Sequence, residues 1–281
     1  MNVIELHLAI DEIDRVGDES WKKTLNHRKL EELKFHDLLR DEFQEVSEKK
    51  SDVEYENFGN KKYYSTVQRS RQFTQQWIRS NSSGVVFLDY ACGNGENSLL
   101  AAECGATLSL GFDISPVSVR NCKRESEKRG LKNIRFFQAD AESTALPDNC
   151  IDVIVCSGML HHLDLSFAFP EMRRILKPGG KVLAIEALDI NPLIKLYRKL
   201  TPKMRTEWES KHILSIKEVK FAQRFFALKQ IKYWHVVGYM AGKFPFLLIP
   251  LEMIDTVLEK IPLVQKMAWI FTFELEKVQE S

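Results

Sequence analysis

Between residues 85 and 188, short apolar runs alternate with segments in which apolar residues recur at helical spacing. Five of these runs end at polar or small residues, as buried strands do. The predicted strands are 85–89, 107–113, 134–139, 152–156 and 181–187. Helices are predicted between them over 99–104, 115–129 and 167–176, and the last should be broken by Pro178-Gly179-Gly180. Such alternation predicts a parallel sheet with helices on both faces.

The pattern changes on both sides of this region. Residues 1–80 are predicted to form a helical N-terminal cap, because Phe35, Leu39, Phe43 and Val46 follow helical spacing opposite a charged face. Two further strands are predicted over 230–237 and 269–275. We expect residues 81–281 to form the main domain, with 189–228 and 240–265 as lid segments inserted into it.

A turn of small residues follows the first predicted strand, and its sequence is Asp89-Tyr90-Ala91-Cys92-Gly93-Asn94-Gly95. A strand, a tight turn and a helix start together form the first half of a nucleotide-binding βαβ unit. The third glycine of a dinucleotide fingerprint is absent, and Ser98 is the nearest small residue. The turn alone is therefore weak evidence for a particular ligand.

Three successive predicted strands end at or beside an aspartate: Asp89, Asp113 and Asp140. In a parallel sheet these side chains meet at one edge, where ligands bind. Asp113 is placed to accept hydrogen bonds from ribose hydroxyls, and Asp140 from an adenine amino group. Asp89 would repel the pyrophosphate of NAD but would attract the cationic end of S-adenosylmethionine. The carboxylates therefore favour S-adenosylmethionine as the cofactor.

Five segments, taken together and in register, resemble class I S-adenosylmethionine-dependent methyltransferases. They are Leu88–Gly95, Leu110–Ser115, Phe137–Glu142 with Leu146-Pro147-Asp148, Ile151–Leu163 and Arg174–Leu183. The resemblance covers about 85–188 and is greatest to small-molecule enzymes such as the quinone-biosynthesis methyltransferases. It implies a Rossmann-like α/β fold, a seven-stranded, mostly parallel sheet whose antiparallel strand is 269–275. Ala91 stands where the family usually has glycine, and its small size suggests little cost.

The resemblance also implies roles for individual residues. The residues expected to bind the cofactor are Asp89, Ala91, Gly93, Gly95, Asp113, Ile114, Asp140, Ala141, Glu142, Cys156 and the cap residue Tyr64. The alternative for Tyr64 is packing in the core. A nucleophilic role for Cys156, as in some RNA methyltransferases, is the less favoured interpretation, because free cysteine often closes a strand.

His161 and His162 follow the fourth predicted strand, close to the expected position of the methyl acceptor. Histidine is a suitable general base near neutral pH, so both are candidate catalytic residues. The alternatives are that they line the pocket or pack the loop. The Asn/Asp-Pro-Pro-Tyr/Phe signature of amino-group methylation is absent, since Cys156-Ser157-Gly158-Met159 occupies its place.

The lid segments are the expected source of acceptor specificity. Tyr197, Arg198 and Arg205 are candidate substrate residues, with the arginines suited to an anionic group. A solvated basic helix face is the alternative. The apolar segment 250–261 would cover a hydrophobic substrate, form a homodimer, contact a membrane or lipid-like substrate, or close the core under the N-terminal helices.

Composition narrows the function further. The net charge of +1 argues against a broad nucleic-acid-binding face. The five cysteines form no pair or Cys/His group with zinc spacing, so we expect reduced thiols, no metal and a cytoplasmic protein. We predict methyl transfer to an O, N or C nucleophile of a small hydrophobic or anionic metabolite. The alternatives are an RNA or protein methyltransferase, a non-catalytic S-adenosylmethionine-binding protein, and a NAD oxidoreductase.

Overall fold

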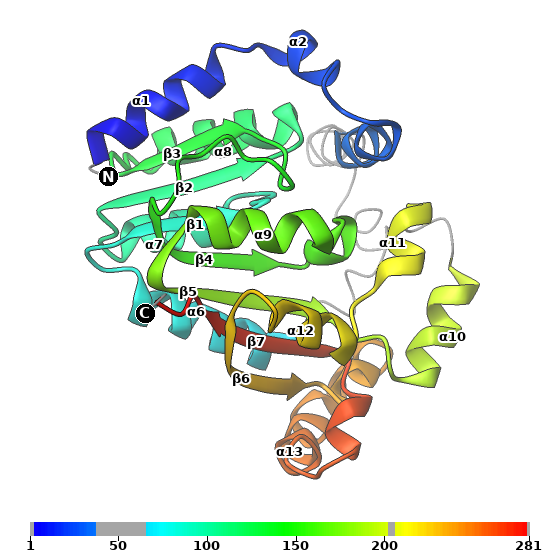
Figure 1. The fold of residues 1–281 in the computed structure, drawn as a ribbon. Coiled ribbons are helices and arrows are strands. Elements are labelled where there is room, and N and C mark those ends of the chain that lie inside the picture. The colour runs from blue at the N-terminus through cyan, green and yellow to red at the C-terminus, as the bar shows by residue number, and fades with distance from the viewer. Residues whose placement is uncertain (1–2, 38–65, 202–205, 280–281) are drawn as a thin grey trace.

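The computed structural model describes residues 3–37, 66–201 and 206–279, with the side chains of 18 and 19 left out. Its centre is a seven-stranded sheet in the order β3-β2-β1-β4-β5-β7-β6 (Figure 1). The strands are β1 Val86–Tyr90, β2 Leu108–Asp113, β3 Ile134–Gln138, β4 Ile151–Ser157, β5 Leu176–Ala187, β6 Ala227–Trp234 and β7 Ile270–Glu276. Strands β1 to β5 pair in parallel, and β7 runs antiparallel to both β5 and β6. The predicted fold class is confirmed, and all seven predicted strands are present.

Helices cover both faces of the sheet, because successive side chains of each strand point to opposite sides. Leu88 packs in a cluster with residues of α1 (Val3–Asp14), α9 (Leu165–Ile175) and α12 (Ile216–Ala222). Phe87 packs on the other face with α6 (Gln68–Asn81) and α7 (Glu96–Glu103). Helix α8 (Pro116–Lys128) joins α7 in a third cluster against β3. The apolar runs of the central strands are thus buried on both sides.

The strand predicted over 230–237 begins and ends three residues earlier, as β6, and the boundary predicted between α9 and β5 is also wrong. The sequence led us to expect a helix to residue 176 and a break at Pro178-Gly179-Gly180. Helix α9 ends at Ile175, and β5 already begins at Leu176 and continues through these residues to Ala187. Gly179, Gly180 and Lys181 follow Pro178 and are residue types common in edge strands. Gly179 N–H nevertheless donates to Lys277 O, and Lys277 N–H donates to Gly180 O. These hydrogen bonds to the chain after β7 keep the segment extended.

The short element η1 (Leu160–His162) follows β4. The other short elements lie between β5 and β7 and are α10 Pro192–Leu200, α11 Glu207–His212, η3 Gly238–Gly242, η4 Pro245–Leu247, α13 Leu248–Leu258 and η5 Val264–Met267. In the N-terminal cap, α1 and α2 (Asp18–Lys22) are followed by helical residues from 27 to 37. Within the described residues, no helix is long and apolar enough to cross a membrane.

The apolar segment 250–261 does not close the core. Ile254 and Ile261 are 47% and 41% exposed and Leu251 and Leu258 are only half-buried, whereas Asp255 is fully buried. The expectation that this segment closes the core under the N-terminal helices is therefore wrong.

Gly111 in β2 packs tightly against Phe136 of the neighbouring strand β3 and against Ser98 of α7. A Cβ added there would lie 2.6 Å from the Phe136 ring and 2.7 Å from Ser98 Oγ. We predict that Gly111→Ala lowers the free energy of unfolding by about 1–3 kcal/mol, measured by urea denaturation, because the core has no room for the methyl group.

The matched test of this cause is Phe136→Leu, which replaces the ring with a smaller aliphatic side chain. Gly111→Ala should cost less in the Phe136→Leu background than in the wild type. An equal cost in both backgrounds would reject crowding by Phe136 as the cause.

Candidate active site

The turn after β1 has a left-handed backbone at three positions. Residues Ala91, Gly93 and Gly95 have φ values of 54°, 56° and 72°. At Gly95, an added Cβ would also lie 2.9 Å from Cys122 Sγ, so glycine is needed here for packing as well as for conformation. Although Ala91 is small, its left-handed backbone is unfavourable for a residue with a Cβ and costs about 1 kcal/mol of conformational strain.

Asp89 is a buried carboxylate at the amino end of α7. Its side chain is 1% exposed and accepts hydrogen bonds of 3.2 Å from Asn97 Nδ2, Ser98 N and Ser98 Oγ. Burial raises the pKa of Asp89 to about 7, although the hydrogen bonds from Asn97 and Ser98 oppose the increase. The nearby charge of Asp113 adds to the increase. The site is thus prepared for a positively charged ligand group that would stabilise the ionised carboxylate.

Asp113 connects the turn to the next helix. Gly93 N–H donates to one carboxylate oxygen at 2.9 Å, and Ser115 N–H donates to the other at 2.9 Å. Ser115 in turn caps α8 through its hydroxyl, which accepts from Ser118 N–H. The carboxylate therefore fixes the shape of the ligand-binding turn before any ligand is bound.

A cavity of about 650 Å³ lies against these turns. Its walls contain eight of the predicted cofactor residues: Asp89, Ala91, Gly93, Asp113, Ile114, Asp140, Ala141 and Glu142. His162 also lines it, while Gly95, Cys156, His161, Tyr197 and Arg198 do not. Tyr64 and Arg205 lie outside the described residues. The structure therefore brings the three strand-end aspartates to one cavity.

The remaining predicted residues have other surroundings. Cys156 is fully buried, its Sγ lies 4.0 Å from Met172 Sδ, and burial raises its pKa well above the usual thiol value. Such a thiol is a poor nucleophile. Arg198 is directed to Asp189 Oδ1 at 3.1 Å and to Leu188 O at 3.4 Å. Tyr197 is in the same helix, and its carbonyl accepts from Thr201 Oγ1.

The N-terminal cap supplies part of the cavity that the sequence analysis missed. Arg28, Lys29, Glu32 and His36 all line it. Lys29 Nζ lies 2.6 Å from Asp140 Oδ2 and 2.9 Å from Glu142 Oε2, and Arg28 also pairs with Glu142. Two cations of helix 27–37 therefore neutralise the carboxylates that follow β3, and the helix forms a wall of the cavity.

Each of the two candidate histidines has a carboxylate at Nδ1. His161 Nδ1 lies 2.7 Å from Glu186 Oε2, and Glu186 is held by Met159 and Leu160 N–H groups at 2.9 and 2.7 Å. His162 Nδ1 lies 2.9 Å from Glu32 Oε2. When the imidazole is neutral, a carboxylate at Nδ1 fixes the proton there and leaves Nε2 as an acceptor.

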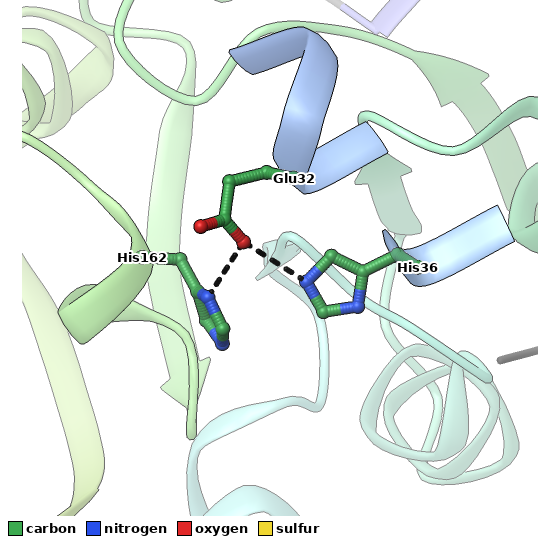
Figure 2. A group of neighbouring side chains, drawn as sticks. All are labelled: Glu32, His36 and His162. Atoms are coloured by element: carbon green, nitrogen blue, oxygen red, sulfur yellow. Dashed lines mark hydrogen bonds and ion pairs between the residues drawn. The ribbon is translucent and has the colours of Figure 1, made fainter. Parts of the chain in front are cut away.

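Figure 2 shows Glu32 between the rings of His36 and His162. The carboxylate of Glu32 also accepts from Thr206 Oγ1 at 2.5 Å. Burial raises the pKa of Glu32, but the hydrogen bonds with His162 and Thr206 and the two nearby imidazoles together hold it below its usual value. The three ligand atoms lie within 4.8 Å of one another, and two imidazoles with one carboxylate could hold a divalent transition-metal ion.

Comparisons with known proteins concern part of the chain and its fold. Residues 88–184 match the family model for the methyltransferase domain. The demethylmenaquinone methyltransferase of Thermus thermophilus is 34% identical over 102 residues, which are 35% of this chain and 46% of that protein. The ribosomal protein L11 methyltransferase of Burkholderia cenocepacia is 32% identical over 38% of this chain and 34% of that protein.

These matches span less than half the length of either relative. Among solved structures, the geranyl diphosphate C-methyltransferase of Streptomyces coelicolor has a TM-score of 0.54 and 16% identity, over 78% of this chain and 84% of that one. A likeness at this identity concerns the fold. The strand order and this likeness place the chain in the class I methyltransferase fold.

The raised pKa of Asp89 generates a prediction for cofactor binding. Below pH 7 the carboxyl must lose a proton before it can pair with the cationic end of S-adenosylmethionine, and this costs binding free energy. We expect the affinity to fall about five- to tenfold between pH 7.5 and pH 6.0, measured by calorimetry.

Asp89→Asn, which retains the shape of the side chain without its titration, is the control. This variant should bind more weakly at pH 7.5 and should lose most of the pH dependence. The same pH dependence in the variant and the wild type would rule out Asp89 as its source.

Proposed function

We propose that this protein transfers a methyl group from S-adenosylmethionine to a small, partly hydrophobic or anionic acceptor. The observation that carries the proposal is the single cavity of about 650 Å³ in which Asp89, Asp113 and Asp140 converge. Its chemistry suits a nucleoside with a cationic tail and without phosphate. The cofactor would supply the activated methyl group, which is already electrophilic.

The described residues fit this cofactor from end to end. Asp89, ionised in the presence of a cation, would bind the methionine end beside the Gly93 turn. Asp113 is in place for the ribose, since a carboxylate can accept from its hydroxyls. Ile114 and Ala141 provide apolar walls for the adenine, and Asp140 provides an acceptor at its amino edge.

On the acceptor side of the cavity, His162 would take the proton. His162 lines the cavity, and Glu32 at its Nδ1 favours the tautomer in which Nε2 accepts. The acceptor atom would provide the electron pair for the new bond to the methyl carbon. The electron pair of the broken carbon–sulfur bond stays on sulfur, and the acceptor's proton passes to His162. Most of the rate would come from holding the two reactants in line.

The cap argues for a small acceptor. Helix 27–37 lines the cavity, and Trp208 of α11 packs against the Arg28 guanidinium at 4.6 Å from the ring centroid. In this proposal the two segments limit access of a protein or RNA substrate to a cavity that is partly open to solvent. The alternative is a macromolecular substrate, as the name of the ribosomal protein L11 methyltransferase indicates for that relative. A macromolecular substrate would require an open site.

The test is a metabolite screen with methyl-labelled S-adenosylmethionine, followed by kinetics on the compound that gains the label. We predict that His162→Ala lowers kcat about 100-fold or more for an acceptor that retains its proton. Glu32→Gln should lower kcat less, because the base remains but its tautomer is no longer fixed. Affinity for S-adenosylhomocysteine should change little in both.

His27→Ala is the matched control, since His27 lies on the same helix with its side chain 87% exposed. Wild-type turnover in both His162→Ala and Glu32→Gln would reject the base. Label recovered only in protein or RNA would reject the small acceptor.

A further inference from the structure

Helix α13 is attached to the protein through its acidic side chains. Asp255 is fully buried and accepts from Val237 N–H at 2.8 Å and Gly238 N–H at 2.9 Å. Glu259 pairs with Arg69 through both carboxylate oxygens at 2.8 and 2.7 Å, and also accepts from His235 N–H. The inward face of this helix is therefore anchored by charged and polar contacts.

The outward face of the same helix is apolar. Ile249, Met253 and Val257 follow one another at intervals of four residues and are 60–71% exposed. Phe246 before the helix and Leu263 after it are 78% and 73% exposed. A surface helix normally presents the opposite arrangement, with its apolar stripe toward the core. We call these five side chains the outer apolar row.

The exposed charges at the two ends of the outer apolar row are positive and come from Lys243 and Lys260. The carboxylates of Asp255 and Glu259 are turned inward, and Glu252 is half-buried with its Oε1 shielded from solvent. A clustered apolar surface with a lysine border complements an anionic lipid bilayer, where apolar side chains enter the acyl boundary and lysines stay among the headgroups.

Helix α10 extends the same type of surface. Leu193, Leu196 and Leu200 are 54–72% exposed, and Lys195 and Lys199 lie between them. The cap residue of this helix, Asn191, donates from its side chain to Met267 O in η5 at 2.7 Å. That hydrogen bond links the start of α10 to the segment that follows the outer apolar row.

We propose that the outer apolar row is a docking surface for an anionic phospholipid membrane. The helix lies in the interface and does not span it, and the inward carboxylates hold it in this orientation. The proposal does not depend on methyl transfer, because it rests only on the exposed side chains and their lysine border.

The experiment is co-sedimentation of the full chain with vesicles of phosphatidylcholine alone or mixed with phosphatidylglycerol. The wild type should bind the mixed vesicles and be partly released by high salt, since salt screens the lysines. The double substitution Ile249→Asp and Val257→Asp should reduce binding about tenfold or more, because charged groups do not enter the acyl boundary.

The matched control is Ile4→Asp with Leu8→Asp in α1, where the wild-type side chains are 70% and 59% exposed. This control should bind vesicles like the wild type. Thermal unfolding and S-adenosylhomocysteine affinity should be unchanged in the α13 variant, so loss of docking is distinguishable from loss of fold or of the proposed activity.

Three results would overturn the proposal. The first is a wild type that binds neither kind of vesicle. The second is an equal loss of binding in the α1 control. The third is a concentration-dependent dimer, seen by analytical ultracentrifugation and abolished by the α13 substitutions, because the face would then be an interface between two copies.

Discussion

The structure of the cavity depends on the hydrogen bonds that Asp113 accepts from Gly93 and Ser115. One carboxylate oxygen holds the turn after β1, and the other holds the start of α8. Two neighbouring βα units are thereby joined at the edge of the sheet where ligands bind. Asp89 does the same within the first unit, since it links the end of β1 to the first turn of α7. The polar groups that would meet the cofactor are thus preorganised, which reduces the cost of ordering them on binding.

The N-terminal cap adds charge to this frame as well as a wall. Arg28 and Lys29 compensate Asp140 and Glu142, so the carboxylates after β3 are not left unpaired in a part-buried site. The same helix carries Glu32 to His162, 130 residues away in sequence. The proposed cofactor and acceptor sides of the cavity are thus both contacted by helix 27–37, and a change in its position would affect both.

Much of the central domain could be predicted from the sequence because its signals are local. Apolar runs of the central strands are buried on both faces, and the aspartates that follow them lie at one edge by the rules of parallel sheets. Glu186, which pairs with His161, has a local signal in the sequence, because it is a carboxylate inside the fifth apolar run. Glu32 and His36 could not be connected to His162, since no spacing rule joins an N-terminal helix to the end of β4. The orientation of α13 could not be predicted either, because periodicity identifies an apolar face but does not show whether that face packs on the core or faces solvent.

The central claim is that the cavity binds an adenosine with a cationic tail through Asp113 and its neighbours. Calorimetric titration of the wild type and Asp113→Asn with S-adenosylhomocysteine tests it most directly. One binding site is expected in the wild type. The variant should lose about 1–3 kcal/mol of binding free energy, because its side chain still accepts hydrogen bonds but has no charge. No binding by the wild type, or equal affinity in both proteins, would contradict it.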